Sequence, residues 1–164
     1  SENYPYLAES GVTIEYNKSS IMAFRPGLKL KLHKGFDNNV TILKLFPGIS
    51  ESVVNSILGT PGLRGVVLET YGSGNTMNYD WFIKSLHSAV TRGIVIFNVS
   101  QCIGGKVIQG RYESSRILEE IGVLSGQDIT TEAAITKLMF LLAKEKNTKE
   151  VKKKLIVPIA GEMS

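Results

Sequence analysis

The stretch that decides the fold reads Gly65-Val66-Val67-Leu68-Glu69-Thr70-Tyr71-Gly72-Ser73-Gly74-Asn75. Its apolar, β-branched start is typical of a buried strand, and the glycines that follow indicate a tight turn. A second apolar run, Ile94 to Val99, leads in the same way into the loop that begins Ser100-Gln101-Cys102. Two such strands joined by a helix are expected to be parallel, so both loops should meet at the carboxyl edge of one sheet, where α/β sheets bind ligands.

Helix patterns alternate with strand patterns along much of the chain. The apolar periodicity predicts two further strands, at 40–46 and 123–124, and five helices. The expected helices lie between Ser50 and Gly59, from about Asn78 to Gly93, over 113–121, from the capping residues 128–130 past Leu142, and over 148–155. We therefore predict an α/β fold: a small open parallel sheet of about four strands flanked by helices, in the three-layer arrangement of Rossmann and flavodoxin-like domains.

The amino-terminal part of the chain has extended character. Residues 11–16 alternate between polar and apolar before the polar turn 17–20, which indicates a hairpin-like segment. After the turn at Arg25-Pro26-Gly27, the stretch Leu28-Lys29-Leu30-Lys31-Leu32 alternates with a period of two. This alternation predicts a half-buried strand, and residues 35–39 are expected to form a loop.

Length and composition indicate one domain with a sizeable core. The chain has 164 residues, of which 43% are hydrophobic and 21% are charged. Its apolar runs are too short to cross a bilayer and no basic-then-apolar leader opens it, so we expect no membrane segment. A single cysteine excludes an internal disulfide, which favours a reducing, cytoplasmic setting.

The net charge of +4 comes from one short stretch. Residues 144–154 hold six lysines and two glutamates, so the rest of the chain is neutral overall. A lysine-rich stretch of this kind usually forms the solvated face of a helix. Nucleic-acid binding would normally add arginines and stacking aromatics, which this stretch lacks, so we expect no nucleic-acid partner.

The glycine loop and the single thiol carry the candidate chemical groups. Gly72-Ser73-Gly74-Asn75 lacks the lysine of a Walker loop and the third glycine of a GxGxxG fingerprint, so it is either a tight turn or an anion-binding loop. Asn75 favours a ligand role, because its amide can donate and accept hydrogen bonds, as an amino acid requires. Cys102 with His33 or His87 is a weak candidate for a nucleophilic pair, and no metal-ligand spacing is present.

Five motifs follow one another along the chain. They are Asn3–Ala8, Leu68–Asn75, Asn98–Val107, Gly110-Arg111-Tyr112, and Gly126–Ala134 with the following Lys137-Leu138. Together they resemble the C-terminal domain of type I (cytoplasmic) L-asparaginases, and the resemblance covers nearly the whole chain. It implies that residues 1–24 are an interdomain linker and N-terminal extended segment, and that residues 25–164 are the C-terminal α/β domain.

The resemblance implies a hydrolase that converts L-asparagine and water to L-aspartate and ammonia, without a cofactor or a metal. In that family the catalytic threonines belong to a larger N-terminal domain, in a Thr-Gly-Gly-Thr-type loop. This sequence contains no Thr-Gly-Gly and no Gly-Thr-Asp, so no catalytic residue is assigned and the chain alone is expected to be inactive. The expected partners are L-asparagine, the N-terminal catalytic domain of the same chain, and further copies in a homodimer or tetramer.

The resemblance also assigns two groups of binding residues. Asn75 would reach the substrate in a partner subunit's site, with Ser73 and Gly74 shaping that approach. Ser100 and Cys102 would line a second, effector site for asparagine, in which allosteric bacterial members carry an arginine at the position of Glu69. An anion beside the carboxylate of the ligand is repulsive, so we expect Glu69 to weaken effector binding.

Two other functions remain open. The amidase subunit of archaeal-type glutamyl-tRNA(Gln) amidotransferase shares this domain, acts on glutamine, and passes ammonia to a partner. The other is a stand-alone amino-acid-binding regulatory domain that catalyses no reaction. Substrate preference distinguishes the first from an asparaginase, and micromolar binding of asparagine without hydrolysis would indicate the second.

Overall fold

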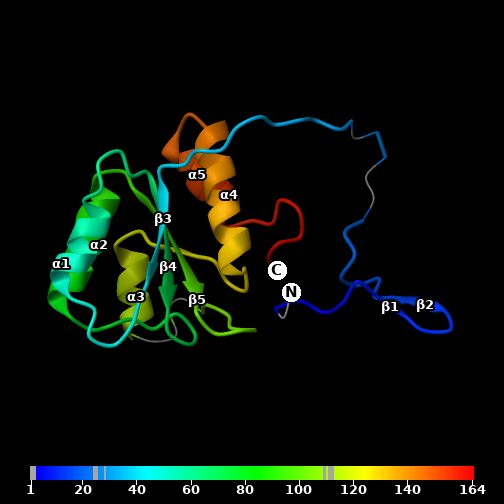
Figure 1. The fold of residues 1–164 in the computed structure, drawn as a ribbon, viewed down its shortest axis with the longest axis horizontal. Coiled ribbons are helices and arrows are strands. Elements are labelled where there is room, and N and C mark those ends of the chain that lie inside the picture. The colour runs from blue at the N-terminus through cyan, green and yellow to red at the C-terminus, as the bar shows by residue number, and fades with distance from the viewer. Residues whose placement is uncertain (1–2, 24–25, 28, 109, 111–112) are drawn as a thin grey trace.

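A four-stranded parallel sheet lies at the centre of the computed structural model, which describes residues 3–23, 26–27, 29–108, 110 and 113–164 (Figure 1). The strands are, in spatial order, β3 (Val40–Lys44), β4 (Gly65–Thr70), β5 (Val95–Ser100) and β6 (Leu124–Ser125). The register pairs Lys44 with Glu69 and Thr70 with Ser100. The carboxyl ends of β3, β4 and β5 therefore lie side by side.

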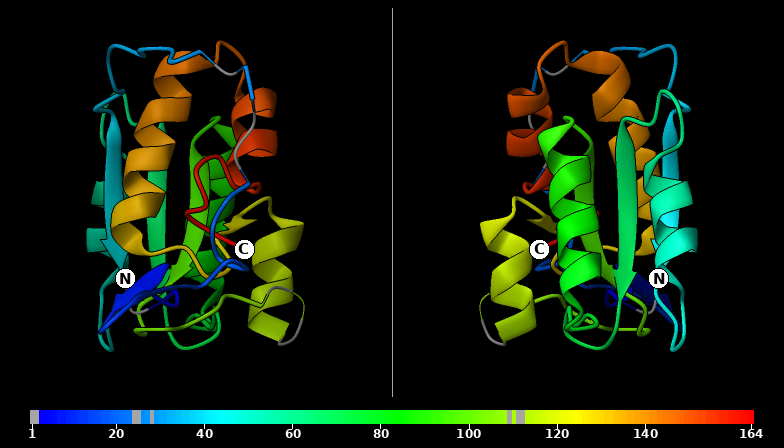
Figure 2. Two further views of the ribbon diagram at one scale, coloured as in Figure 1. Left: turned by 90° about the vertical axis from the view of Figure 1, so that its right-hand side faces the viewer. Right: turned by 90° about the vertical axis from the view of Figure 1, so that its left-hand side faces the viewer.

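Helices cover both faces of the sheet and give the predicted three layers (Figure 2). One face carries α1 (Glu51–Leu58), α2 (Asp80–Thr91) and α3 (Glu113–Glu120), and the other carries α4 (Thr131–Lys144) and α5 (Thr148–Leu155). The strand order follows the sequence without a reversal, so right-handed crossovers place the three connecting helices on one face. The predicted α/β fold class is confirmed.

The sheet separates two apolar cores. Successive side chains of a strand point to opposite faces, so the residues of β4 alternate between the cores. Val66 and Leu68 pack with Phe82 of α2 on one side, whereas Val67 packs with Leu138 of α4 on the other. Because all five side chains are fully buried, both helix layers are fixed against the strand that leads into the glycine loop.

The predicted caps set the starts of α1 and α4. The Ser50 hydroxyl accepts a hydrogen bond from the Val53 amide at 3.4 Å, and the Thr130 hydroxyl accepts one from the Ala133 amide at 3.3 Å. Each hydroxyl oxygen satisfies an amide that has no partner within the first helical turn. The first helix ends at Gly59, as predicted.

The amino-terminal hairpin is formed, but the predicted strand after it is not. β1 (Ala8–Ser10) pairs antiparallel with β2 (Ile14–Tyr16), in a hairpin that projects from the rest of the structure (Figure 1). Residues 29–39 pair with no strand and Leu30 is 99% exposed, while Leu28 lies outside the described residues. The prediction of a half-buried strand is wrong here, because no neighbouring strand in the described chain offers these leucines a surface to cover.

The described amino-terminal segment, which begins at Asn3, meets the carboxyl-terminal residue Ser164 beside the start of α4 (Figure 1). The Tyr4 hydroxyl and the Ser164 amide both donate to Asp128 Oδ1, at 3.2 and 2.9 Å. The Asn3 side chain donates to the Asp128 carbonyl at 2.9 Å and accepts from the Gly104 amide at 2.8 Å. Burial and the charge of Asp128 raise the pKa of Tyr4 well above its usual value. The Tyr4 hydroxyl therefore keeps its proton and donates the hydrogen bond. These bonds hold the amino-terminal segment against the carboxyl edge of the sheet.

Candidate functional site

The two predicted loops meet at the carboxyl edge of the sheet. At the end of β5, the Ser100 hydroxyl donates to the Gly72 carbonyl at 2.5 Å and accepts from the Cys102 amide at 3.0 Å. The Ile108 amide donates to the Ser73 carbonyl at 3.0 Å. Hydrogen bonds thus connect the loop after β4 to the loop after β5, as the parallel sheet predicts.

The glycine loop after β4 is a tight turn that presents Asn75. Backbone hydrogen bonds of 2.9 Å run in both directions between Tyr71 and Asn75, and Gly74 has a positive φ of 104°. Gly74 is buried, and a Cβ there would lie 2.9 Å from Val107 Cγ1, so a larger residue would need its neighbours to move. The half-buried Asn75 side chain has no hydrogen-bond partner among the described residues. Its amide is therefore available to a ligand.

A polar pair lies buried beneath this turn. Thr70 Oγ1 donates to Asn98 Oδ1 at 2.7 Å, and the Asn98 carbonyl accepts from the Gly126 amide at 2.7 Å. The Asn98 side-chain nitrogen has no partner in the described structure, and it lies 3.5 Å from where a Cβ of Gly74 would stand. The pair supports the turn from below. In the sequence, the feature that could have indicated this pair is Asn98, an asparagine within the largely apolar run of β5.

A cleft of about 440 Å³ opens between the ends of β4 and β5 and the start of α4. Its lining residues are Asn3, Glu69, Ser100, Gln101, Cys102, Ile103, Thr130, Thr131 and Glu132. The cleft brings together the three residues of the predicted effector group, Glu69, Ser100 and Cys102. The three residues of the predicted substrate group, Ser73, Gly74 and Asn75, do not line it. The two predicted groups of binding residues therefore lie on connected loops, but only the effector group lines this cleft.

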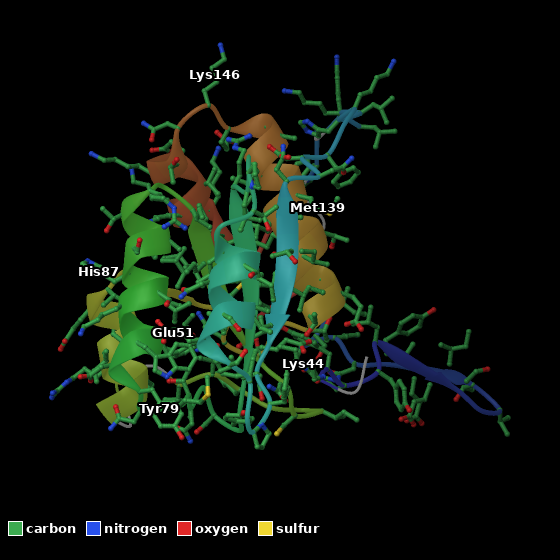
Figure 3. All side chains as sticks on the ribbon, turned by 60° about the vertical axis from the view of Figure 1, so that its left-hand side comes forward. Lys44, Glu51, Tyr79, His87, Met139 and Lys146 are labelled. Atoms are coloured by element: carbon green, nitrogen blue, oxygen red, sulfur yellow. The ribbon has the colours of Figure 1, made fainter. Side chains whose placement is uncertain are left out.

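Glu69 is the buried anion of this cleft. Its side chain is 10% exposed, and its Oε1 accepts a hydrogen bond of 2.5 Å from the Thr131 hydroxyl. Its Oε2 lies 3.3 Å from Nζ of Lys44, the residue opposite in the β3–β4 register, whose side chain is 63% exposed. Figure 3 shows Lys44 at the end of the edge strand β3. A helix residue therefore holds one carboxylate oxygen, and a surface lysine holds the other.

Gln101 fixes the loop after β5, a role that sequence reasoning did not assign. Its Nε2 donates to the carbonyls of Leu45 and Glu69, at 2.6 and 2.8 Å, and its backbone amide donates to the Thr70 carbonyl at 2.9 Å. These bonds join the loop to the ends of β3 and β4. Glutamines in loops are usually exposed, so nothing in the local pattern indicates this role.

The single thiol pairs with neither histidine in the described structure. Cys102 is exposed at the cleft, whereas the His33 ring contacts the Phe140 ring edge-on, with 5.3 Å between centroids. His87 lies on α2, on the side away from Lys44 (Figure 3). Among the residues that the structure describes, no three His, Cys, Asp or Glu side chains gather as metal ligands would. The groups that the described site presents to a ligand are therefore hydrogen-bonding and charged side chains.

The lysine-rich stretch lies away from the cleft. Lys154 forms an ion pair of 2.7 Å with Glu145, and Val151 on the other side of α5 is buried. Lys146 projects from the end of the molecule opposite Lys44 (Figure 3). No residue of this stretch lines the cleft. Across the described ranges, no helix combines the length and the apolar character needed to span a bilayer.

Comparison with known proteins places the chain in a family. Residues 39–155, from the start of β3 to the end of α5, match the glutaminase/asparaginase C-terminal domain. The chain belongs to this family. The matched residues of the glutaminase/asparaginase C-terminal domain include both loops and the start of α4. Of the motifs that carry the resemblance, only Arg111 and Tyr112 lie outside the described residues.

Individual proteins resemble the chain over its full length. L-asparaginase 1 of Escherichia coli K12 is 34% identical over 164 residues, which cover 100% of this chain and 48% of that protein. The human 60 kDa lysophospholipase is 34% identical over 165 residues, which cover 100% of this chain and 28% of that protein. The crystal structure of L-asparaginase I from Vibrio cholerae matches with a TM-score of 0.91 and 33% identity, covering 99% of this chain and 49% of that one.

A further relative matches a shorter stretch. One component of the glutamyl-tRNA(Gln) amidotransferase of Sulfolobus acidocaldarius is 35% identical over 129 residues, which cover 79% of this chain and 28% of that protein. The chain spans about half the length of the Escherichia coli and Vibrio cholerae asparaginases that it matches. Those relatives therefore contain a further half to which no part of this chain corresponds.

Proposed function

We propose that the chain is the C-terminal part of an L-asparaginase, which hydrolyses L-asparagine to L-aspartate and ammonia. The observation that carries the proposal is the 34% identity to E. coli L-asparaginase 1 over the entire chain. The catalytic threonines then belong to an N-terminal domain, since this sequence contains no Thr-Gly-Gly. Residues 1–24 form the linker to that domain, and residues 25–164 form the C-terminal domain.

In this proposal Asn75 completes the substrate site. The tight turn fixes its backbone, while its side-chain amide has no partner among the described residues. An amide donates and accepts hydrogen bonds, so it can bind the α-amino or the α-carboxylate group of asparagine. Ser73 and the buried Gly74 shape the turn and set the direction in which Asn75 points.

The proposed substrate site lies between subunits of a homodimer or tetramer. Exposed apolar side chains of the amino-terminal arm, among them Val12 and Leu30, support such an assembly. A second copy or the N-terminal domain would remove these side chains from water. We place the protein in the cytoplasm, where the single Cys102 would stay reduced.

The amidase component of a glutamyl-tRNA(Gln) amidotransferase is the second candidate. Its support is the 35% identity to the Sulfolobus acidocaldarius amidotransferase protein over 79% of the chain. We rank the asparaginase first because its similarity extends over all 164 residues. A higher kcat/KM for L-glutamine than for L-asparagine, measured as ammonia release by the complete protein, would reverse this order.

Asn75→Ala in the complete protein is expected to lower kcat/KM for L-asparagine about ten- to hundredfold. A hydrogen bond to a charged group contributes about 1.5–3 kcal/mol, and about 1.4 kcal/mol is a factor of ten. The variant should fold normally, because the backbone of residue 75 closes the turn. Steady-state ammonia release gives the kinetics, and thermal denaturation checks the fold.

Asn78→Ala is the matched control, since Asn78 is an exposed asparagine slightly further along the same loop. Equal kinetics for the wild type and Asn75→Ala would remove Asn75 from the substrate site. The 164-residue chain alone should release no ammonia, and measurable hydrolysis by it would contradict the placement of the catalytic threonines elsewhere. Micromolar binding of asparagine by the complete protein without hydrolysis would favour an amino-acid sensor.

A further inference from the structure

A buried amide of β5 lies directly beneath the turn that presents Asn75. Asn98 is completely buried, and its side-chain nitrogen lies 3.5 Å from where a Cβ of Gly74 would stand. The same point lies 2.9 Å from Val107 Cγ1. Asn98 and Val107 therefore form the surface on which Gly74 packs. Because Asn75 is the next residue of the chain, a displacement of Gly74 would also move the Asn75 amide.

The Asn98 side-chain nitrogen is unfavourable for the stability of the fold. It has no hydrogen-bond partner among the described residues. Buried polar groups are nearly always paired, because an unpaired group loses its hydrogen bonds to water without gaining others. A leucine, which branches at the same carbon, would avoid this loss. An asparagine at such a position indicates a requirement other than stability, as is common where a fold supports a functional site.

Thr70 fixes the direction in which the Asn98 amide faces. Thr70 Oγ1 donates to Asn98 Oδ1 at 2.7 Å, so the amide oxygen faces Thr70 and the amide nitrogen faces Gly74. Thr70 is completely buried at the end of β4, and its backbone carbonyl accepts from the Gln101 amide at 2.9 Å. Asn98 lies within the paired part of β5, opposite Leu68. The two side chains are therefore held by neighbouring strands rather than by the turn itself.

We propose that Asn98, oriented by Thr70, is a positioning residue for asparagine hydrolysis, which keeps the Asn75 amide in the direction that the substrate requires. The inference rests on the proposed function, because Asn98 acts on the reaction through Asn75. A displacement of about 1 Å at a substrate-binding group can lower the rate of an enzyme about a hundredfold. Loss of the Asn98 amide should therefore lower the activity while the fold persists.

Asn98→Leu in the complete protein separates positioning from stability. The variant lacks the unpaired nitrogen, and the Thr70 hydroxyl keeps the Val99 carbonyl at 3.2 Å as an acceptor. We expect the midpoint of urea unfolding to stay at the wild-type value or to rise, while kcat/KM for L-asparagine falls about tenfold or more. A folded Asn98→Leu variant with the kcat/KM of the wild type would overturn the proposal.

Val95→Ala is the matched control, at a completely buried residue where β5 begins, at the opposite end of the strand from the turn. It should lower the urea midpoint and leave kcat/KM unchanged, because the cavity that it creates is remote from Asn75. An equal loss of kcat/KM in Val95→Ala would overturn the proposal, because any disturbance of the core would then have the same effect.

A second pair of variants tests the role of Thr70 and keeps the proposal falsifiable if Asn98→Leu fails to fold. Thr70→Val keeps the shape of the side chain but removes the hydrogen bond to Asn98, and it should lower kcat/KM several-fold. Thr70→Ser keeps the hydroxyl and should retain the wild-type kcat/KM. Equal kinetics for the two variants would contradict the orientation of Asn98 by Thr70.

The double variant Asn75→Ala/Asn98→Leu shows whether Asn98 acts through Asn75. It should have the same kcat/KM as Asn75→Ala, and a further tenfold loss would overturn the proposal. If Asn75→Ala alone left the kinetics unchanged, the proposed substrate role of Asn75 would fail, and crystal structures would then test positioning by itself. The Asn75 side chain should point in a different direction in Asn98→Leu than in the wild type, and an unchanged direction would overturn the positioning role.

Discussion

Glu162→Ala is expected to lower the free energy of unfolding by about 3–5 kcal/mol, the usual cost of breaking a buried ion pair. Lys137 Nζ lies 2.6 Å from Glu162 Oε1, and the lysine side chain is 3% exposed. Without the carboxylate, the partners of the Lys137 ammonium group among the described residues are the Val157 carbonyl at 2.7 Å and the Met163 sulfur at 3.0 Å. These neutral partners cannot balance a buried charge.

The same carboxylate organises the tail that follows α5. Glu162 accepts hydrogen bonds from the Ile159 amide at 3.0 Å and from the Ala160 amide at 2.7 Å. Burial alone would raise the pKa of Glu162, but the bonds from Lys137 and these amides outweigh burial and lower the pKa to about 2. Burial also lowers the pKa of Lys137, although Glu162 acts to raise it. The carboxylate is therefore strongly favoured in its charged form.

This lowered pKa sets the pH range over which Glu162 contributes. A carboxyl group whose pKa is lower in the folded state stabilises the fold fully above its ordinary value of 4.5, and the contribution is lost as the pH falls towards about 2. Urea unfolding at about pH 7 and about pH 3 measures the difference. The wild type should lose more stability between these two values than Glu162→Ala does.

The double variant Lys137→Met/Glu162→Met separates the charges from the packing around them. Replacing both charges with apolar groups should recover most of the lost stability, because no buried charge is left unpaired. Glu150→Ala is the matched control, since Glu150 pairs with Lys153 at 3.0 Å on the solvated face of α5, where such pairs contribute little. A loss in Glu162→Ala no larger than the loss in Glu150→Ala would contradict the importance of the buried pair.

Some helices and strands can be predicted from the residues within them and immediately beside them. The run 65–70 is long and apolar enough to indicate a buried strand, and the caps Ser50 and Thr130 act within three residues. The same reasoning fails at Leu30, because an alternating stretch becomes a strand only where a neighbour is available to pair with it. A strand forms only when it pairs with a second strand, and the sequence of one segment does not show whether such a partner lies beside it.

The candidate site is less visible in the sequence because its contacts join distant segments. Glu69 meets Thr131 through the packing of α4 on β4, and it meets Lys44 through the register of β3 with β4. Lys137 has the pattern of a surface residue, and its burial depends on Glu162 in a tail without periodicity. The sequence indicates which loops share an edge of the sheet, but the partners of each charge come from tertiary packing.

Leu138→Ala is expected to lower the free energy of unfolding by about 2–5 kcal/mol, because Leu138 is completely buried between α4 and β4. Gly65, the first residue of β4, makes the close approach of this helix possible. A Cβ at Gly65 would lie 2.8 Å from Leu138 Cδ2 and 2.9 Å from Leu142 Cδ1. Gly65→Ala should therefore destabilise the fold by about 1–3 kcal/mol through overpacking.

The two changes should compensate when they are combined, because the new methyl group occupies part of the space that the leucine leaves. The Gly65→Ala/Leu138→Ala double variant should therefore lose clearly less stability in urea unfolding than the two single losses together. Gly93→Ala with Leu138→Ala is the matched control: a Cβ at Gly93 meets nothing within 4 Å and costs only backbone strain, so those losses should add. Additive losses in the Gly65 pair as well would mean that this glycine does not set the distance between the sheet and α4.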